Sequence, residues 1–348
     1  MCGFESHLRY IFPPSMFYSV IIPLYNRPDE IQELLESLAQ QSYKNFEVIV
    51  VEDGSTITSE HIIQAYKSEL DIHYFFKPNS GPGPTRNFGF EKARGDFFIM
   101  FDSDCIVPPH YLETVNTFIQ SYKLDAFGGP DKAHEEFSPL QKAMNYAMTS
   151  FLTTGGIRGN SKRIGVFHPR SFNMGFSRKV YEVTHGFELD RLGEDIDLSI
   201  RILKNGFLCT LIPEAFVYHK RKNNFRQFLQ QTFNFGKTRI DLFLKHPDEL
   251  KLVHFFPSFF VLYTISIIII TFLPINSIYK IIFASPWILY LLTIILDATI
   301  FYKSLYLGVL SMVASVVQLF GYGTGFLYHL FLKIKRVFQT VLQKFSKQ

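Results

Sequence analysis

The sequence predicts an α/β fold, a mostly parallel sheet flanked by helices, followed by a C-terminal α-helical membrane region. Strand-like apolar runs alternate four times with helical segments before residue 107, which is typical of a parallel sheet covered on both faces. Most charged and turn residues lie within residues 17–250, whereas the last third holds long runs with almost no charge. A helix needs about 20 apolar residues to cross the hydrocarbon core of a membrane.

The first half of the α/β region shows each element by its own signals. Continuous apolar runs bounded by turn residues indicate buried strands, while Pro28 and the acids after it mark a helix start. That helix carries Ile31, Leu34 and Leu38 at helical spacing. In chain order we expect strands at 18–24, 46–51, 72–76 and 97–101, with helices from 28, near 60–67 and over 85–93 between them.

Polar residues follow several of these strands. Asn26, Asp53, the loop from Gly81 to Arg86, and Asp102 all come after a strand end or at the next helix start. In open parallel sheets, ligands bind beyond the carboxyl ends of the strands. We therefore expect one crevice to collect these residues, although Asp53 precedes Gly54 and is equally well explained as a turn residue.

Asp102-Ser103-Asp104 is the most informative of these segments, because it follows the buried strand 97–101. Mg²⁺ and Mn²⁺ prefer oxygen ligands and are usually held by one or two carboxylates together with substrate phosphates. The tripeptide alone is a weak signal, since acids also collect in turns. With its context, it predicts a metal site and a nucleotide diphosphate as the first substrate class to test.

Arg86 stands in what the sequence predicts to be the first turn of a helix. The helix dipole makes a cation unfavourable there. A bound anion would remove the conflict, and a side chain that extends to solvent would avoid it.

A second acidic cluster, Gly193-Glu194-Asp195, begins a predicted helix in which Ile196, Ile200 and Leu203 share a face. Acids in a first turn are common capping residues. The competing interpretation is a catalytic base, because sugar transfer with inversion needs a carboxylate to take the acceptor's proton.

His219 follows a short predicted strand at 216–218. It could complete a metal site, although lone histidines are more often structural. The neighbouring Arg221 and Lys222 could face phosphate or form a solvated basic surface.

Composition narrows the remaining classes. The chain has 348 residues and a formal net charge of +4, and its three cysteines, Cys2, Cys105 and Cys209, show no paired spacing. This argues against a disulfide framework or a zinc site. The excess basic residues lie late in the chain, which suits an anionic membrane surface better than nucleic acid. Residues 1–16 lack the pattern of a secretory signal.

The C-terminal third contains three apolar runs, at 255–279, 281–296 and 304–332, of which the second is a little short but can be extended past Asp297 to Tyr302. Before them, residues 225–243 mix aromatic and basic side chains, as an interfacial segment does. After them, five basic residues and an apolar stripe predict a helix lying on the inner leaflet. Three crossings would place this basic tail on the side opposite the α/β domain, against the usual charge preference. An even number of crossings would satisfy both.

Together these motifs resemble the family 2 glycosyltransferases, which have the Rossmann-like GT-A fold. The resemblance covers residues 17–222 in the right order. It rests on five segments: Ser19-Val20-Ile21-Ile22-Pro23-Leu24-Tyr25-Asn26, Val51-Glu52-Asp53-Gly54-Ser55, Arg86-Asn87-Phe88-Gly89, Asp102-Ser103-Asp104 and Gly193-Glu194-Asp195.

The resemblance implies a role for each matching residue. Asp195 would be the catalytic base, and Asp104 would bind Mn²⁺ or Mg²⁺ with Asp102 and His219. Asn173 and Glu194 would lie on the acceptor side. The nucleotide sugar, of UDP, GDP or dTDP type, would contact Pro23, Tyr25, Asn26, Glu52, Asp53, Arg86, Asp102 and Ser103.

Two departures from the family pattern bear on function. Glu52-Asp53 stands where two aspartates are common, so the base contact could be shared or altered. Processive members carry Gln-x-x-Arg-Trp after the base, whereas the nearest segment here is Gln231-Thr232-Phe233-Asn234-Phe235. We therefore expect transfer of one or a few sugars to a lipid-linked or cell-envelope glycan acceptor.

The expected organisation has five parts and a multi-pass location in the inner, cytoplasmic membrane, in contact with its lipids, with the catalytic domain facing the cytosol. The alternatives are a processive polysaccharide synthase and a non-catalytic membrane scaffold that binds nucleotide sugars. The parts are an N-terminal extension (1–16), a glycosyltransferase domain (17–222, with a nucleotide-binding half 17–107 and an acceptor half 108–222), an interfacial segment (223–253), a transmembrane region (254–332) and a basic amphipathic tail (333–348).

Overall fold

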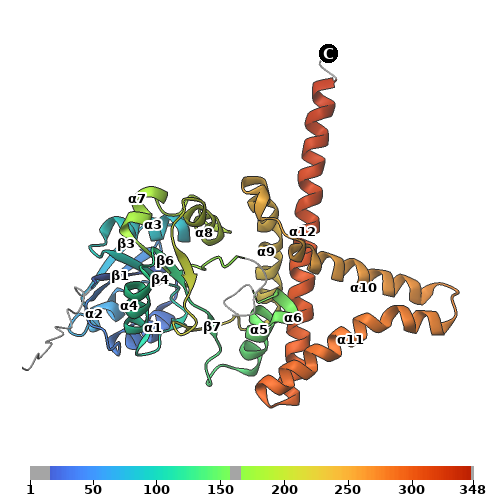
Figure 1. Ribbon diagram of the computed structural model, residues 1–348, viewed down its shortest axis with the longest axis horizontal. Coiled ribbons are helices and arrows are strands. Elements are labelled where there is room, and N and C mark those ends of the chain that lie inside the picture. Colours follow the sequence, from blue (N-terminus) through green and yellow to red (C-terminus); the bar gives the residue numbers. More distant parts are fainter. Residues whose placement is uncertain (1–15, 157–165, 346–348) are drawn as a thin grey trace, which may run out of the picture.

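The structure is a computed structural model that describes residues 16–156 and 166–345. An α/β domain forms one half of the molecule, and long helices form the other (Figure 1). Apart from Met16, the expected N-terminal extension lies outside the described residues.

Seven strands form the main sheet: β1 (Tyr18–Leu24), β2 (Phe46–Asp53), β3 (Ile72–Lys77), β4 (Phe97–Phe101), β6 (Ala126–Gly128), β8 (Asn173–Ser177) and β9 (Cys209–Leu211). Their spatial order is β3-β2-β1-β4-β8-β6-β9. β8 runs antiparallel to β4 and β6, and the other neighbouring pairs are parallel. The predicted mostly parallel sheet is confirmed.

Helices cover both faces of this sheet. They are α1 (Pro28–Ala39), α2 (Glu60–Ala65), α3 (Pro82–Lys92), α4 (Tyr111–Tyr122), α7 (Arg178–Thr184) and α8 (Glu194–Lys204). Successive strand residues point to opposite faces. Ile22 therefore packs in a core with residues of α1 and α4, and Ile21 packs in a second core with residues of α3 and α8.

The helix α3 begins at Pro82, three residues earlier than the sequence predicted. Proline is tolerated in a first helical turn because no intrahelical partner awaits its missing N–H. The Gly-Pro-Gly-Pro segment is therefore partly helical rather than all loop. As a result, Arg86 lies beyond the first turn, and the predicted conflict with the helix dipole is weaker than expected.

A second sheet holds three short strands in the order β5 (Cys105–Ile106), β10 (Val217–His219) and β7 (Asp131–Lys132). In its register, His219 pairs with Cys105. This sheet brings His219 to the segment that follows β4, although the two are more than a hundred residues apart in sequence.

The helical half contains α5 (Pro139–Thr149), α6 (Phe151–Thr154), α9 (Phe225–Lys245), α10 (Phe256–Phe272), α11 (Ser277–Tyr302) and α12 (Leu305–Phe345), with 3₁₀ turns η1 (Pro247–Glu249) and η2 (Leu252–Phe255). α9 and α5 pack against α12. α10 and α11 form a hairpin that projects from α12 away from the α/β domain (Figure 1). Three stretches are long and apolar enough to cross a membrane: Leu252–Phe272, Ser277–Tyr302 and Leu305–Arg336.

Two boundaries in this half differ from expectation. The predicted apolar run 255–279 is interrupted, because α10 ends at Phe272 and the Asn276 side chain caps α11. Pro274 lies in the turn between them. The expected separate tail helix is instead continuous with α12 as far as Phe345.

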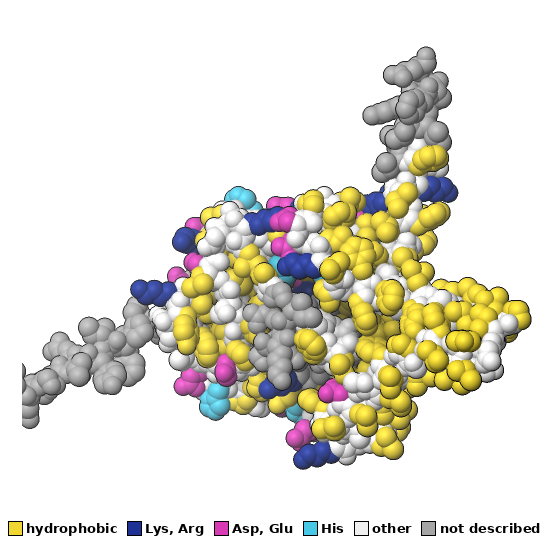
Figure 2. Space-filling view, turned by 45° about the vertical axis from the view of Figure 1, so that its right-hand side comes forward, with side chains coloured by type: hydrophobic (Ala, Val, Ile, Leu, Met, Phe, Trp, Pro, Cys, Tyr) yellow, Lys and Arg dark blue, Asp and Glu magenta, His cyan; other side chains and the backbone are white. Residues whose placement is uncertain are grey.

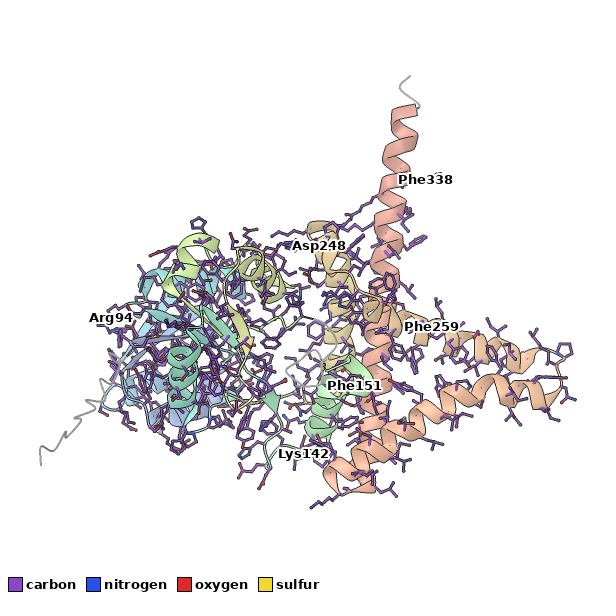
Figure 3. All side chains as sticks on the ribbon, viewed as in Figure 1. Arg94, Lys142, Phe151, Asp248, Phe259 and Phe338 are labelled. Carbon is purple, nitrogen blue, oxygen red and sulfur yellow. The ribbon has the colours of Figure 1, made fainter. Side chains whose placement is uncertain are left out.

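Side chains hold the helical half together and join it to the α/β domain (Figure 3). The Tyr146 hydroxyl donates to the Asp297 carboxylate at 2.5 Å, and Tyr290 donates to the Leu152 carbonyl at 2.9 Å. Both bonds join α11 to the α5–α6 segment. Asp248, labelled in Figure 3, pairs with Lys204 of α8 at 3.0 Å.

Candidate active site

The loops after β1 and β2 are joined by hydrogen bonds. Asn26, which has a positive φ of 52°, accepts bonds at Oδ1 from the Thr56 N–H at 2.8 Å and the Ile57 N–H at 3.1 Å. Its own N–H donates to the Ser55 hydroxyl at 2.8 Å. Asparagine is among the few residues that adopt this backbone conformation readily. Asn26 therefore joins the loops at the carboxyl ends of β1 and β2, where the sequence predicted one rim of a crevice.

Asp53 organises the next part of the rim. Its carboxylate accepts bonds from the Ser80 and Gly81 N–H groups, each at 2.9 Å, and pairs with Lys77. Burial alone would raise the pKa of Asp53, but Lys77 and the two N–H groups hold it below its usual value. Asp53 thus positions the start of α3.

Arg86 of α3 connects the two acidic clusters. Its guanidinium donates to Asp102 at 2.6 Å and to Glu194 at 3.4 Å, and its side chain is almost fully buried. The Asp102 carboxylate is therefore the main partner of Arg86 in this structure, and Glu194 is a second, longer contact. Neither a free anion nor solvent is needed to explain its charge.

Asp104 and His219 form the best candidate metal site. Asp104 Oδ1 lies 3.2 Å from His219 Nε2, while Arg27 donates to Asp104 Oδ2 at 2.6 Å. Oδ1 is buried and has no hydrogen-bond partner among the described residues. Two ligands of one divalent ion typically lie about 3 Å apart, given ligand distances of roughly 2.0–2.2 Å. The pair therefore fits a divalent cation.

The charged groups around Asp104 and His219 shift the pKa values of both residues. Burial would raise the pKa of Asp104, but His219 and Arg27 keep it well below its usual value. Burial would lower the pKa of His219, yet Asp104 and Asp131 raise it. His219 also stacks on the Phe172 ring, with 4.7 Å between ring centroids. Asp131 lies 3.8 Å from His219 Nδ1, where a carboxylate can orient a metal-binding imidazole.

The neighbouring Cys105 does not fit the same ion. Its thiol lies near Asp104 and His219, but burial and the nearby carboxylates raise its pKa well above the usual value. It contacts the Phe172 carbonyl at 3.6 Å. A buried neutral thiol is a poor ligand for Mg²⁺ or Mn²⁺, so Asp104 and His219 are the stronger pair.

Asp102, Glu194, Asp195 and His219 line one cavity of about 640 Å³. The N-terminus of α8 presents the two acids, because Gly193 before them adopts a positive φ of 78°. Asp195 Oδ1 accepts the Ile196 N–H at 2.7 Å and lies 3.7 Å from Arg170 Nη1. Asp104 lines a second, polar hollow of about 930 Å³. Arg221 lines both spaces, and His219, which lines the first, lies 3.2 Å from Asp104 of the second.

The two acids at the start of α8 have different surroundings. Burial and the charge of Asp195 raise the pKa of Glu194 to about 8, with Arg86 opposing the shift. Glu194 therefore carries a proton for much of its population at neutral pH. The Asp195 side chain is about twice as exposed as that of Glu194, 20% against 10%. Asp195 is the more accessible of the two to an acceptor.

Other residues expected at the site lie farther from this cavity. The buried Glu52 carboxylate accepts bonds from the Ser59 N–H at 3.0 Å and from the Tyr74 hydroxyl at 2.5 Å. The Asn173 amide is fully buried and bonds to Tyr111 and to the Ala215 carbonyl. Both side chains hold the framework in this conformation.

The three remaining residues are close to strand ends. Pro23 lies within β1, half-buried Tyr25 follows that strand, and buried Ser103 separates the two aspartates. No side-chain hydrogen bond is found for Tyr25 or Ser103 among the described residues. Nothing in their arrangement opposes contact with a nucleotide.

Sequence reasoning missed Arg27, Asp131 and Arg170. Arg27 precedes a predicted helix, Asp131 follows a Gly-Gly-Pro turn, and Arg170 lies in a segment without periodicity. Each becomes notable only through its partner: Arg27 with Asp104, Asp131 with His219 and Arg221, and Arg170 with Asp195. The sequence signal that could have indicated these residues was the presence of acids, because buried acids need partners of opposite charge.

Comparison with known proteins gives a consistent assignment. Residues 19–184 match the family described as Glycosyl transferase family 2. An uncharacterized glycosyltransferase of Rickettsia bellii is 40% identical over 102 residues, which cover 29% of this chain and 15% of that protein. The Staphylococcus aureus protein TarS, described as a poly(ribitol-phosphate) beta-N-acetylglucosaminyltransferase, is 38% identical over 144 residues, which cover 37% of this chain and 25% of TarS. The matched segments thus span a quarter or less of these relatives.

A solved structure shares the fold. The mannosyltransferase PcManGT from Pyrobaculum calidifontis, in complex with GDP-Man and Mn²⁺, superposes with a TM-score of 0.62. The superposition covers 88% of this chain and 87% of that one, at 16% identity. At this identity the similarity establishes the GT-A fold alone.

Proposed function

Since residues 19–184 form a glycosyltransferase family 2 domain, we propose that this chain is a metal-dependent, inverting glycosyltransferase. It moves a sugar from a nucleotide diphosphate to a lipid-linked or cell-envelope glycan, one or a few sugars at a time. The observation that carries the proposal is the cavity shared by Asp102, Glu194, Asp195 and His219. Two acidic groups with separate duties are what this transfer requires.

The donor is expected along the carboxyl ends of β1, β2 and β4. Asn26 and Asp53 order the loops where the nucleoside would lie, and Arg86 lies between the two acidic clusters. UDP, GDP and dTDP sugars are all compatible with these contacts. The complex of PcManGT with GDP-Man and Mn²⁺ makes a nucleotide sugar and a divalent ion reasonable first ligands to test.

Asp104 and His219 would hold the divalent ion, whereas the Asp102 carboxylate pairs with Arg86. When bound, such an ion neutralises charge on the departing diphosphate. In this structure Arg27 donates to Asp104, and Asp131 lies 3.8 Å from His219 Nδ1, where it can orient the imidazole ring. The donor set of one carboxylate and one imidazole is compatible with Mn²⁺ as well as Mg²⁺.

Asp195 is the proposed base. The acceptor hydroxyl attacks the anomeric carbon, Asp195 takes the hydroxyl proton, and the bond to the diphosphate breaks. The side-chain contacts found for Asp195 among the described residues approach Oδ1, which leaves Oδ2 able to accept the proton. Glu194, which is neutral for much of its population near pH 7, limits repulsion between the adjacent carboxyl groups. Attack on the face opposite the diphosphate inverts the anomeric configuration.

The Asp195→Asn variant tests this assignment. We expect donor binding, followed by calorimetry, to remain nearly unchanged, because the amide keeps the shape of the side chain. Transfer should fall by a factor on the order of 10²–10⁴, the usual contribution of a positioned base. The exposed carboxylate Glu182, changed to Gln, is the control and should behave as the parent. Equal transfer rates in Asp195→Asn and the parent would reject Asp195 as the base.

The membrane arrangement is also part of the proposal. α10 and α11 present a broad apolar surface (Figure 2). Charged residues lie near both ends of α11, at Lys280 and Asp297, and leave an apolar run between them. α10 has 17 residues, which is about the minimum for a crossing helix. We infer that this hairpin crosses the inner membrane twice.

α12 would then lie along the cytosolic membrane surface. Its exposed apolar side chains recur mostly at helical spacing, at Leu305, Val309, Val313, Tyr328, Phe331, Ile334 and Phe338. Its opposite face packs on α9. Two crossings leave the catalytic domain and the basic end of α12 on the same side, as the distribution of Lys and Arg favours.

A further inference from the structure

The cavity that holds the catalytic acids continues into the helical half. Its far walls come from α9, α10, α12 and the η2 turn, including the apolar side chains of Phe235, Phe256, Pro257 and Leu319. Leu252 and Phe256 line it and are also exposed, Leu252 by 90%. One cavity therefore joins a polar reaction centre to an apolar surface that we place in or beside the bilayer.

Arg170, Arg239 and His254 are among the basic side chains that line this cavity, with Arg191, His219 and Arg221. The Nε atoms of Arg170 and Arg239 are buried and have no hydrogen-bond partner among the described residues. The ion pair found for Arg170 is the 3.7 Å approach to Asp195, and in the described part of the chain none is found for Arg239 or His254. His254 accepts the Lys251 N–H at Nδ1, which leaves Nε2 for another partner.

Within the described residues, the positive charges around Arg170, Arg239 and His254 outnumber the negative charges that pair with them. The Lys251 N–H bonds to His254 on its Nδ1 side. The nearby Glu249 already forms ion pairs with His168 at 3.2 Å and with Lys251 at 3.6 Å. Burial and Arg239 lower the pKa of Arg170, against the effect of Asp195. Buried cations are normally paired. Arg170 and Arg239 face one cavity, and the ion pair found for them is the loose one between Arg170 and Asp195. This arrangement indicates a missing anion.

We propose that Arg170, Arg239 and His254 bind the phosphate or diphosphate headgroup of a lipid acceptor, whose hydrocarbon chain leaves the cavity past Leu252 and Phe256. Guanidinium groups suit phosphate because their donors match its oxygens in pairs. The apolar walls and exposed rim accept a hydrocarbon chain, which a free glycan acceptor would not use. This inference rests on the proposed function and names the acceptor class for the same site.

The donor's own diphosphate is the other source of a phosphate group. Arg239 and His254 come from the helical half, whereas the residues proposed to hold the donor, Asn26, Asp53 and Arg86, come from the α/β domain. A change at Arg239 should therefore separate the two sources. Nucleotide binding should be insensitive to it, and lipid phosphate binding should not.

The test uses the full chain in detergent, with calorimetry of four probes: farnesyl phosphate, farnesol, inorganic phosphate and GDP or UDP with Mn²⁺. We expect the parent to bind farnesyl phosphate more tightly than farnesol or inorganic phosphate. Arg239→Gln should weaken farnesyl phosphate binding about 10- to 100-fold, the range for a lost charge-assisted hydrogen bond, and leave nucleotide binding unchanged. Arg239→Lys, which keeps the charge, should lie between them.

Lys237→Gln is the matched control, because Lys237 is on the same helix but does not line the cavity. It should bind all four probes as the parent does. Equal binding of farnesol and farnesyl phosphate, or no effect of Arg239→Gln, would overturn the inference. A parallel loss of nucleotide affinity would also overturn it and assign the arginines to the donor. If no nucleotide sugar bound the parent, the proposed function itself would fail.

Discussion

At the scale of single residues, the two aspartates of the Asp102-Ser103-Asp104 motif have different partners and therefore different expected roles. Asp102 pairs with Arg86 at 2.6 Å and lines the large cavity, whereas Asp104 contacts Arg27 and His219. An arginine pairs with each carboxylate, and Asp104 also has beside it an imidazole that can bind metal. Asp104 is therefore the better candidate ligand, and Asp102 the better candidate for orienting Arg86 and the donor.

Asp197 is the residue at which a pH effect on stability is expected. Its fully buried carboxylate pairs with Lys245 at 2.6 Å, His246 at 2.9 Å and Arg201 at 3.0 Å, which ties α8 to the end of α9. Burial would raise the pKa of Asp197, but Lys245, His246 and Arg201 hold it below its usual value. A depressed carboxyl pKa stabilises the fold above pH ~4 and loses this effect as pH falls through the folded-state pKa.

Asp197→Asn should therefore lower the unfolding free energy by about 3 kcal/mol at neutral pH, the lower end for breaking a buried ion pair. The difference from the parent should shrink as pH falls below about 4, because the unfolded parent binds a proton at Asp197 there, whereas the folded parent does so only at lower pH. Thermal unfolding in detergent between pH 3 and 7.5 measures both effects. Asp190→Asn, at an exposed position, is the control. A difference that stays constant across this range would contradict the ion-pair explanation.

The acids of the site could be predicted from the sequence, but most of their partners could not. Asp102, Asp104, Glu194 and Asp195 follow a strand or begin a helix, so local sequence shows them. Arg170 contacts Asp195 only because a segment between α6 and β8 folds back onto α8. Such pairings depend on tertiary packing, which local patterns do not encode.

At the scale of elements, α9 and α12 pack closely through glycines. A Cβ atom at Gly236 would lie 2.0 Å from the Tyr322 carbonyl oxygen, and one at Gly325 would lie 2.1 Å from that of Phe233. The neighbouring atoms are backbone, so they cannot move aside as a flexible side chain would. The glycines therefore set the distance between the two helices.

Gly236→Ala should destabilise this helix pair by about 1–3 kcal/mol, the usual cost of overpacking a close contact. We expect a lower unfolding temperature in detergent and faster proteolysis, because α9 must move away from α12. Gln230→Ala, at an exposed position of α9, is the control and should have little effect. An unchanged unfolding temperature for Gly236→Ala would show that the helices are not held at this distance.

Elements with strong hydrophobic periodicity were predicted well. Some of their boundaries were not, because they depend on proline and capping residues, which hydrophobic periodicity does not show. The first four strands and α1 match the expected ranges closely. The start of α3 was misplaced because Pro82 and Pro84 fit a first helical turn as well as a loop. The turn at 273–276 was missed because the absence of charge outweighed Pro274 and the capping Asn276.

At the scale of the whole molecule, the α10–α11 hairpin and α12 make different predictions for the membrane. If the hairpin crosses twice, its tip near Asn276 lies on the side opposite the catalytic domain. In a background without cysteine, Asn276→Cys should react with an impermeant maleimide added to intact cells. Glu182→Cys, in the catalytic domain, should react only after the cells are permeabilised.

Other labelling patterns would revise this arrangement. Protection of Asn276→Cys in intact cells would mean that the hairpin enters the bilayer without crossing it. Labelling of Glu182→Cys in intact cells would reverse the orientation of the whole chain.

The central claim is direct displacement at the anomeric carbon, with Asp195 as the base and a divalent ion at Asp104 and His219, of which His219 lines the same cavity as Asp195. The most direct test is NMR of the anomeric configuration of the first product, made with the nucleotide sugar that the parent enzyme turns over in Mn²⁺. We predict inversion: an α-linked donor gives a β-linked product. A product with the donor's configuration, or donor binding without any product across acceptors, would contradict the account.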